Sequence, residues 1–242
     1  MDFSESVIVA ATLVTLSYAS VTDLKHREVK EYVWVPATVV AVLLNTLLGR
    51  YGLLELFLAS LPAVLVLVLA LLDMMGGADF LALLVVTLAH PRIYPKPVTY
   101  LTLIYSLAFP AALILWNLVQ GLKNLNRFKK VKCSRGSKFM LLFLGRPARV
   151  GDFLGSKFTY LLTIPSRPEE DLFECRMSFS MDDIHEEGLK EYVSELVRGG
   201  RLGLDELIWV TPGMPQIAFY LLGYIAALIT PEALLRFIIP ST

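Results

Sequence analysis

Two aspartates stand at the edges of apolar segments, where a charged side chain is costly. Asp23 follows the apolar residues 7–22, and Asp79 directly precedes the apolar run 80–89. A carboxylate at a membrane boundary usually faces the protein interior or a water-filled cavity, because lipid does not solvate it. These two residues are therefore the first candidates for chemistry.

Two carboxyl groups held close together can act as an acid and a base. Repulsion between like charges favours a state in which the pair shares one proton. The ionised member can then take a proton from water, while the protonated member hydrogen-bonds the scissile carbonyl. If the carboxyl groups of Asp23 and Asp79 come close, this chemistry gives peptide hydrolysis with no metal and no covalent intermediate.

Small residues precede Asp79, namely Gly76, Gly77 and Ala78. They allow the backbone to kink and a substrate chain to approach closely. A structural role is the alternative, in which Asp79 caps a helix after a glycine turn. The spacing of the residues leaves both roles open.

Asp23 lies near the end of its predicted helix, where the helix dipole disfavours a negative charge unless Lys25 or Arg27 compensates. An ordinary charge at the membrane edge is the alternative here. No adjacent sequence ties Asp23 to Asp79, so we expect that substrate binding completes the pair.

Other residue types offer less chemistry. Cys133 and Cys175 are expected to be structural thiols, because both fall in a predicted cytoplasmic domain and no histidine lies near them. The three histidines occupy different loops or helices, and "GGAD" lacks the glycine spacing and the lysine of a nucleotide site. The sequence therefore predicts no cofactor and no metal.

The composition indicates a protein of the lipid bilayer. Of its 242 residues 55% are hydrophobic and 18% are charged, and the mean hydropathy is +0.61, which is unusual for a soluble domain. Several apolar segments approach the ~20 residues that cross a bilayer. We therefore predict a polytopic α-helical membrane protein with about six transmembrane helices, at residues 7–22, 33–48, 56–72, 80–89, 97–119 and 212–230.

Basic residues cluster after the first and the fifth apolar segments. The positive-inside rule places such clusters in the cytoplasm. The prediction is a multi-pass cell-membrane protein whose N-terminus is outside and whose two aspartates share the cytoplasmic face. Nucleic-acid binding is not expected, because no aromatic residues interleave with the basic ones. The clusters are Lys25, Arg27 and Lys30, then Lys123, Arg127, Lys129, Lys130 and Lys132.

The predicted domains are residues 1–121 with five helices and both aspartates, a cytoplasmic soluble domain at 122–207, and residues 208–242 with the sixth helix and the C-terminus. The soluble domain is expected to be small and mainly antiparallel β, inserted between the fifth and sixth helices. The runs "KFMLLFL", "SKFTYLLTI" and "FECRMSF" are expected to be strands. The stretch 182–200 has the apolar spacing of a helix.

Three stretches carry a resemblance to a known family: "YASVTDLKHREV", "MMGGADF" and "WVTPGMPQIAFYLLGY". They resemble the archaeal preflagellin and prepilin peptidases, membrane aspartyl proteases of the GxGD type, over nearly the whole chain. The resemblance implies that Asp23 and Asp79 are catalytic. Gly76, Gly77 and Ala78 match the motif before the second aspartate, with Ala78 in the place of a second glycine, as fits the prepilin peptidase branch.

The resemblance also implies the partner, a preflagellin or type IV pilin-like precursor with a short basic leader before a hydrophobic helix. The chain lacks a four-cysteine cluster, so the zinc module and methyltransferase activity of bacterial relatives are not implied. A proton-coupled transporter that uses the aspartates as proton carriers is the alternative. The almost uncharged middles of the apolar segments and the lack of an inverted repeat count against it. A membrane anchor or assembly subunit would leave the aspartates without a purpose.

Overall fold

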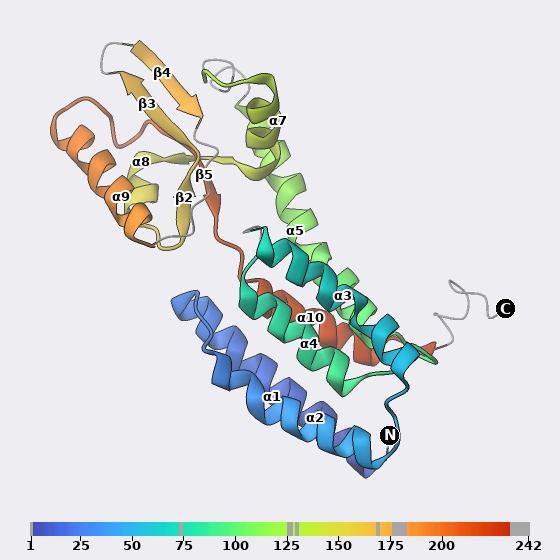
Figure 1. Ribbon diagram of the computed structural model, residues 1–242. Coiled ribbons are helices and arrows are strands. Elements are labelled where there is room, and N and C mark those ends of the chain that lie inside the picture. Colours follow the sequence, from blue (N-terminus) through green and yellow to red (C-terminus); the bar gives the residue numbers. More distant parts are fainter. Residues whose placement is uncertain are drawn as a thin grey trace. The chain divides into compact units, whose positions relative to one another are not determined.

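The chain divides into two compact units in the computed structural model (Figure 1). Unit 1 comprises Met1–Pro110 and Pro215–Thr242, and unit 2 comprises Ala111–Met214. The structure describes residues 2–72, 75–124, 128, 131–167, 170–175 and 183–232. Each unit is considered by itself below.

Unit 1 is helical. Helix α1 packs against α2, α4 and α10, and α4 also packs against α2, α3 and α10. All six predicted apolar segments are helical, which confirms that part of the prediction. The helices are α1 (Phe3–His26), η1 (Glu31–Trp34), α2 (Val35–Leu47), α3 (Leu53–Leu71), α4 (Gly77–Ala89), the first part of α5 (Val98–Lys123) and α10 (Gln216–Ile229).

Small residues let these helices approach closely, as is common between membrane helices. Ala19, Ala63 and Ala82 are buried in the shared core. At Gly223 in α10, an added Cβ would collide with the Thr102 carbonyl of α5. The backbones of α5 and α10 are therefore in near contact at this glycine.

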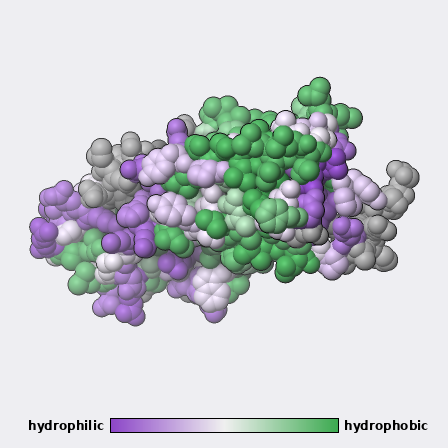
Figure 2. Space-filling view, turned by 90° about the horizontal axis from the view of Figure 1, so that it is seen from below, coloured by the Kyte–Doolittle hydropathy of each residue, from purple (hydrophilic) through white to green (hydrophobic). Residues whose placement is uncertain are grey.

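Large apolar side chains cover much of the outside as well as the inside. Figure 2 shows a broad apolar surface in its view of the molecule, and Val14, Leu47 and Leu65 are among the exposed side chains. A helix in water turns its polar face outward. The apolar exterior instead fits contact with lipid.

Among the described residues, three helices are long and apolar enough to cross a membrane, namely α1, α3 and α5. The other three apolar helices are shorter. Helix α4 has 13 residues, or about 20 Å, against the ~30 Å of a hydrocarbon core. Six crossings therefore stay a prediction.

Unit 2 combines helices with two small antiparallel sheets. Strand β5 is central in the first sheet and pairs with β1 on one side and β2 on the other, while β3 pairs with β4. The elements after the end of α5 are α7 (Arg135–Leu144), β1 (Arg146–Arg149), α8 (Val150–Gly155), β2 (Thr159–Leu161), β3 (Thr163–Arg167), β4 (Glu170–Cys175), α9 (Asp183–Arg198) and β5 (Leu207–Pro212).

Some of the predicted elements of this unit are right and one is wrong. The predicted strand 156–164 contains β2 and the start of β3, and residues 173–175 of another predicted strand end β4. The predicted helix is α9. Residues 176–179 and 182 of these predictions lie outside the described residues. The run 138–144 is helical and not a strand, because Ser134 caps α7 by accepting from the Ser137 N–H at 3.1 Å. A short apolar run carries no period that separates strand from helix. "Mainly β" is therefore wrong for this unit.

A disulfide joins Cys133, just before α7, to Cys175 at the end of β4, with the Cα atoms 5.3 Å apart. The expectation of two structural thiols is wrong. That expectation came from the predicted compartment, whereas the pairing depends on two segments 42 residues apart that meet only in the fold.

Candidate active site

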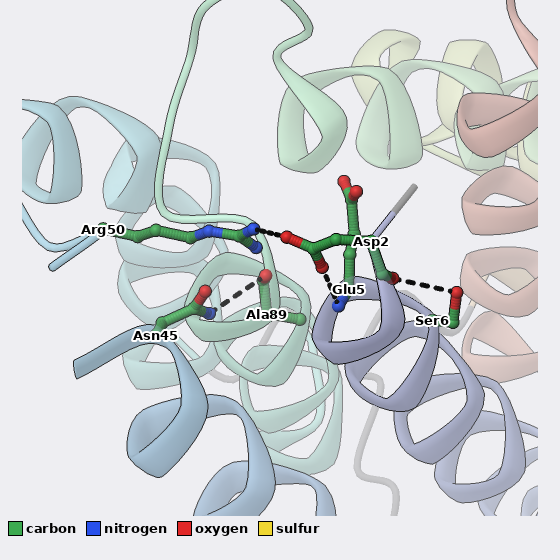
Figure 3. Close-up of polar contacts among 6 residues, drawn as sticks. All are labelled: Asp2, Glu5, Ser6, Asn45, Arg50 and Ala89. Carbon is green, nitrogen blue, oxygen red and sulfur yellow. Dashed lines mark hydrogen bonds and ion pairs between the residues drawn. The ribbon is translucent and has the colours of Figure 1, made fainter. Parts of the chain in front are cut away.

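Polar contacts fix one end of unit 1 (Figure 3). Asp2, which caps the start of α1, forms an ion pair with Arg50 at 2.7 Å. Asn45 in the last turn of α2 donates to the carbonyl of Ala89, the last residue of α4, at 3.2 Å. Because Arg50 follows α2 by three residues, the start of α1 and the end of α4 lie at the same end of the unit.

The two candidate aspartates consequently share the opposite end. Asp23 is in the last turn of α1, and Asp79 is in the first turn of α4. The antiparallel arrangement of two helices far apart in sequence brings them together.

Asp23 is buried where α1 meets α10. Its Oδ2 has no hydrogen-bond partner among the described residues. The backbone N–H of Ile217 in α10 interacts with the carboxylate, and the Ser20 hydroxyl donates to the Ile217 carbonyl at 3.3 Å. The first turn of α10 is thereby held against the Asp23 side chain, and one carboxylate oxygen keeps its hydrogen-bonding capacity for another group.

Asp79 is partly buried and has a capping role at the start of α4. Its Oδ2 accepts from the Gly76 N–H at 3.1 Å, and its own N–H donates to the Gly76 carbonyl at 3.0 Å. This reciprocal pair satisfies backbone groups that a helix start leaves unpaired. Asp79 therefore does cap α4, as the structural interpretation expected. The hydrogen bond to Gly76 also fixes the direction of its carboxylate.

The glycines before Asp79 leave space instead of allowing an unusual backbone. Gly76 has φ −78° and ψ 148°, an extended conformation that any residue adopts. A Cβ at Gly77 would meet no atom within 4 Å. Gly76 therefore adopts no conformation reserved for glycine, whereas Gly77 leaves room for an approaching chain. Ala78 packs against the core of unit 1.

The two predicted basic residues differ in position. Arg27 ends α1 in a left-handed conformation with φ 56°, and its N–H donates to the Asp23 carbonyl at 2.9 Å. Its positive charge acts on the Asp23 carboxylate. Lys25 is exposed on the surface of α1. Arg27 is thus the residue that compensates the charge of Asp23.

Asp23 and Asp79 belong to one electrostatic site, because their charges are close enough to act on each other. Within the described part of the chain, no hydrogen bond joins their carboxyl groups. Sharing a proton directly would require a closer approach. This geometry agrees with the expectation that the pair is completed only when substrate binds.

Two family models match the chain. One, described as the type IV leader peptidase family, matches residues 10–116 and so includes both aspartates. The other, described as the archaeal peptidase A24 C-terminus, type II, matches residues 137–231. The chain belongs to the type IV leader peptidase family. No curated protein matches it.

Membership makes this leader peptidase a hydrolase that acts on precursor proteins, and its apolar helices indicate a membrane protein. The family membership favours a peptidase over a proton-coupled transporter. The two matches extend over the helices of unit 1 and most of unit 2.

One further residue of the leader peptidase lies at this end and was missed by sequence reasoning. Tyr220 in α10 is fully buried, and its hydroxyl has no hydrogen-bond partner among the described residues. The Asp79 charge and the Gln216 side chain both act on this hydroxyl. Within the apolar stretch "IAFYLLGY" the sequence predicts an ordinary core tyrosine. Only the unpaired hydroxyl in the described structure distinguishes Tyr220 from such a residue.

Proposed function

We propose that this leader peptidase is an aspartic-type endopeptidase whose catalytic pair is Asp23 and Asp79. The observation that carries the proposal is their convergence, from helices α1 and α4, at one end of unit 1. The unpaired Oδ2 of Asp23 is free to bind water or a peptide group.

The chemistry uses one carboxylate as base and the other, protonated, as acid. The base takes a proton from water, and the water oxygen attacks the scissile carbonyl carbon while the acid hydrogen-bonds its oxygen. Collapse of the tetrahedral intermediate breaks the C–N bond, and the leaving amine takes a proton from the pair. A buried orphan hydroxyl at Tyr220 supplies a further hydrogen-bond donor beside Asp79.

Closure precedes this chemistry, because no hydrogen bond yet joins the carboxyl groups in the described residues. A substrate chain that lies between the ends of α1 and α4 can bring them together. Gly77 gives that chain room beside Asp79, and the Gly76 N–H holds the Asp79 carboxylate. Arg27 holds the Asp23 charge in place, and Lys25 adds positive charge at the surface.

The substrate we propose is a preflagellin or a type IV pilin-like precursor, cut after its short basic leader at the cytoplasmic face. The support is the positive-inside pattern of the basic clusters together with the resemblance to the preflagellin and prepilin peptidases. The Cys133–Cys175 disulfide does not decide the side, since intracellular disulfides persist in hyperthermophilic archaea and bacteria.

The test is cleavage of a preflagellin-like substrate by the purified protein in detergent with EDTA present. We expect the wild type to cut, and Asp23→Asn and Asp79→Asn to be inactive while still folded. Asparagine at position 79 keeps an oxygen for the Gly76 N–H, so α4 retains its cap.

Asp205→Asn is the control, because Asp205 is an exposed carboxylate of unit 2 whose ion pair with Arg149 lies on the surface. This variant should cut normally. Activity in either Asp23→Asn or Asp79→Asn, or loss of wild-type activity in EDTA, would contradict the aspartic mechanism.

A further inference from the structure

Helix α7 in unit 2 presents an aromatic face that no part of the described chain covers. Phe139 is 65% exposed and Met140 is 48% exposed. The rings of Phe139 and Phe143 pack on each other, with centroids 4.6 Å apart. The opposite side of the helix is anchored, because Leu141 is fully buried. Helix α7 thus has two apolar faces, one buried at Leu141 and one exposed at Phe139 and Met140.

Helix α7 is fastened to the last turns of α5. Asn117, which is 2% exposed, donates through Nδ2 to the carbonyls of Phe143 and Leu144 at 3.3 and 3.2 Å. These bonds satisfy carbonyls that the end of α7 would leave unpaired. A Cβ at Gly121 would meet Leu142 Cδ1 at 2.7 Å, so α7 lies directly on α5 there.

These contacts fix the direction of α7 along α5. Leu142 lies at Gly121, and the later residues Phe143 and Leu144 lie at Asn117. The C-terminal end of α7 therefore points back along α5, away from the end of α5 at Lys123. The start of α7 points the other way.

The depth of α7 follows from α5, which is a candidate membrane span. Leu115, Trp116 and Leu122 are exposed on this part of α5, as expected for contact with lipid. A lysine that ends a span extends to the interface. Asn117 precedes Lys123 by six residues, or about 9 Å along the axis, so the C-terminal end of α7 lies about 9 Å deeper than the end of α5.

We propose that α7 runs antiparallel to the last turns of α5 at the membrane interface and places Phe139 and Met140 at the boundary between headgroups and acyl chains. Arg135 and Lys138, in its first turns, would contact lipid phosphates; Arg135 is exposed and Lys138 is partly exposed. The partner of this surface is a bilayer that contains anionic phospholipid. The inference does not depend on the proposed peptidase mechanism.

Photocrosslinking in lipid nanodiscs tests the proposal. The photoreactive amino acid p-benzoylphenylalanine replaces Phe139, Leu115 or Tyr192 in the full chain, in discs of phosphatidylcholine and phosphatidylglycerol. Leu115 is the positive control on α5. Tyr192, which is 41% exposed on α9 of the same unit, is the negative control. All three side chains are exposed, so none of the replacements disturbs a core.

After irradiation, intact mass spectrometry should find lipid adducts at positions 115 and 139 and none at 192. Adducts at 115 without adducts at 139 would overturn the proposal. Adducts at 192 with the same yield as at 139 would also overturn it, because the contact would then not be specific to α7.

The headgroup contact has its own test, the double variant Arg135→Gln and Lys138→Gln with the probe at 139. Its adduct yield should fall in discs with phosphatidylglycerol and stay unchanged in pure phosphatidylcholine. An unchanged yield in both lipids would refute the role of the two basic residues.

Discussion

Tyr220 and Tyr224 form a matched pair for testing the site. They lie one turn apart in α10, and both are fully buried. The Tyr224 hydroxyl forms a hydrogen bond with His90 Nε2 at 2.8 Å, at the end of unit 1 where α4 ends. The Tyr220 hydroxyl has no partner in the described chain and lies in the field of Asp79. Replacement of each by phenylalanine removes only the hydroxyl.

The two changes should have opposite effects on stability. Tyr224→Phe leaves the His90 nitrogen unpaired and should lower the free energy of unfolding by about 1–3 kcal/mol. Tyr220→Phe removes a buried hydroxyl that has no hydrogen-bond partner in the described residues, so stability should stay equal or rise by up to about 1 kcal/mol. Thermal unfolding of each variant in detergent measures the difference.

For cleavage, Tyr220→Phe should be the harmful change and Tyr224→Phe the harmless one. If the Tyr220 hydroxyl bonds water or substrate beside Asp79 in the transition state, the loss of about 1–3 kcal/mol lowers kcat roughly 5- to 150-fold. KM should change little, because the bond is absent before closure. Tyr224→Phe should keep the kcat of the wild type at a temperature where it remains folded.

The assay is leader-peptide cleavage over a range of substrate concentrations and pH. A Tyr220→Phe variant that cuts like the wild type with an unchanged pH profile would refute the reasoning. So would a Tyr220→Phe variant that loses stability as Tyr224→Phe does, since its hydroxyl would then have a structural partner.

Three further predictions concern backbone space and the disulfide. Gly77→Leu should fold normally, because no atom lies within 4 Å of its Cβ position, and should cut more slowly; thermal unfolding and cleavage rates check both parts, and normal cleavage would contradict the role of this space. Gly223→Ala should lower stability by about 1–3 kcal/mol through overpacking against α5, and an unchanged unfolding temperature would argue against the close contact. Replacing Cys133 and Cys175 by serine opens a loop of 42 residues. The free energy of unfolding should fall by roughly 4 kcal/mol, because the unfolded chain gains entropy. The comparison with the wild type is made under oxidising conditions, and equal stability would mean that the disulfide does not form.

The helices were predictable because long apolar runs have few other ways to satisfy their backbone in lipid. All six runs are helical, and the charge pattern correctly anticipated that Asp23 and Asp79 share one end of the helices. Which side of the membrane that end faces stays a prediction. So do the roles of the two aspartates.

The failures have a common cause, which is dependence on distant contacts. The run 138–144 is a helix because Ser134 caps its start and Asn117 of α5 donates a hydrogen bond to the Phe143 carbonyl near its end. The disulfide depends on the approach of β4 to the segment before α7. Tyr220 is distinguished only by a hydroxyl that has no hydrogen-bond partner among the described residues. No local sequence pattern predicts the helix at 138–144, the disulfide or this hydroxyl.

If Asp23 and Asp79 close on the substrate as proposed, the polar contacts at the far end of unit 1 affect how α1 and α4 can move. Arg50 and Asn45 tie the start of α1 and the end of α4 to the same short segment, so that end acts as a pivot. Asp23 lies about 30 Å along α1 from Asp2. A tilt of about 5° around the pivot then moves its carboxylate by roughly 3 Å, the length of a hydrogen bond. Strengthening the pivot should leave closure free, whereas a second tie at the aspartate end would lock the peptidase open.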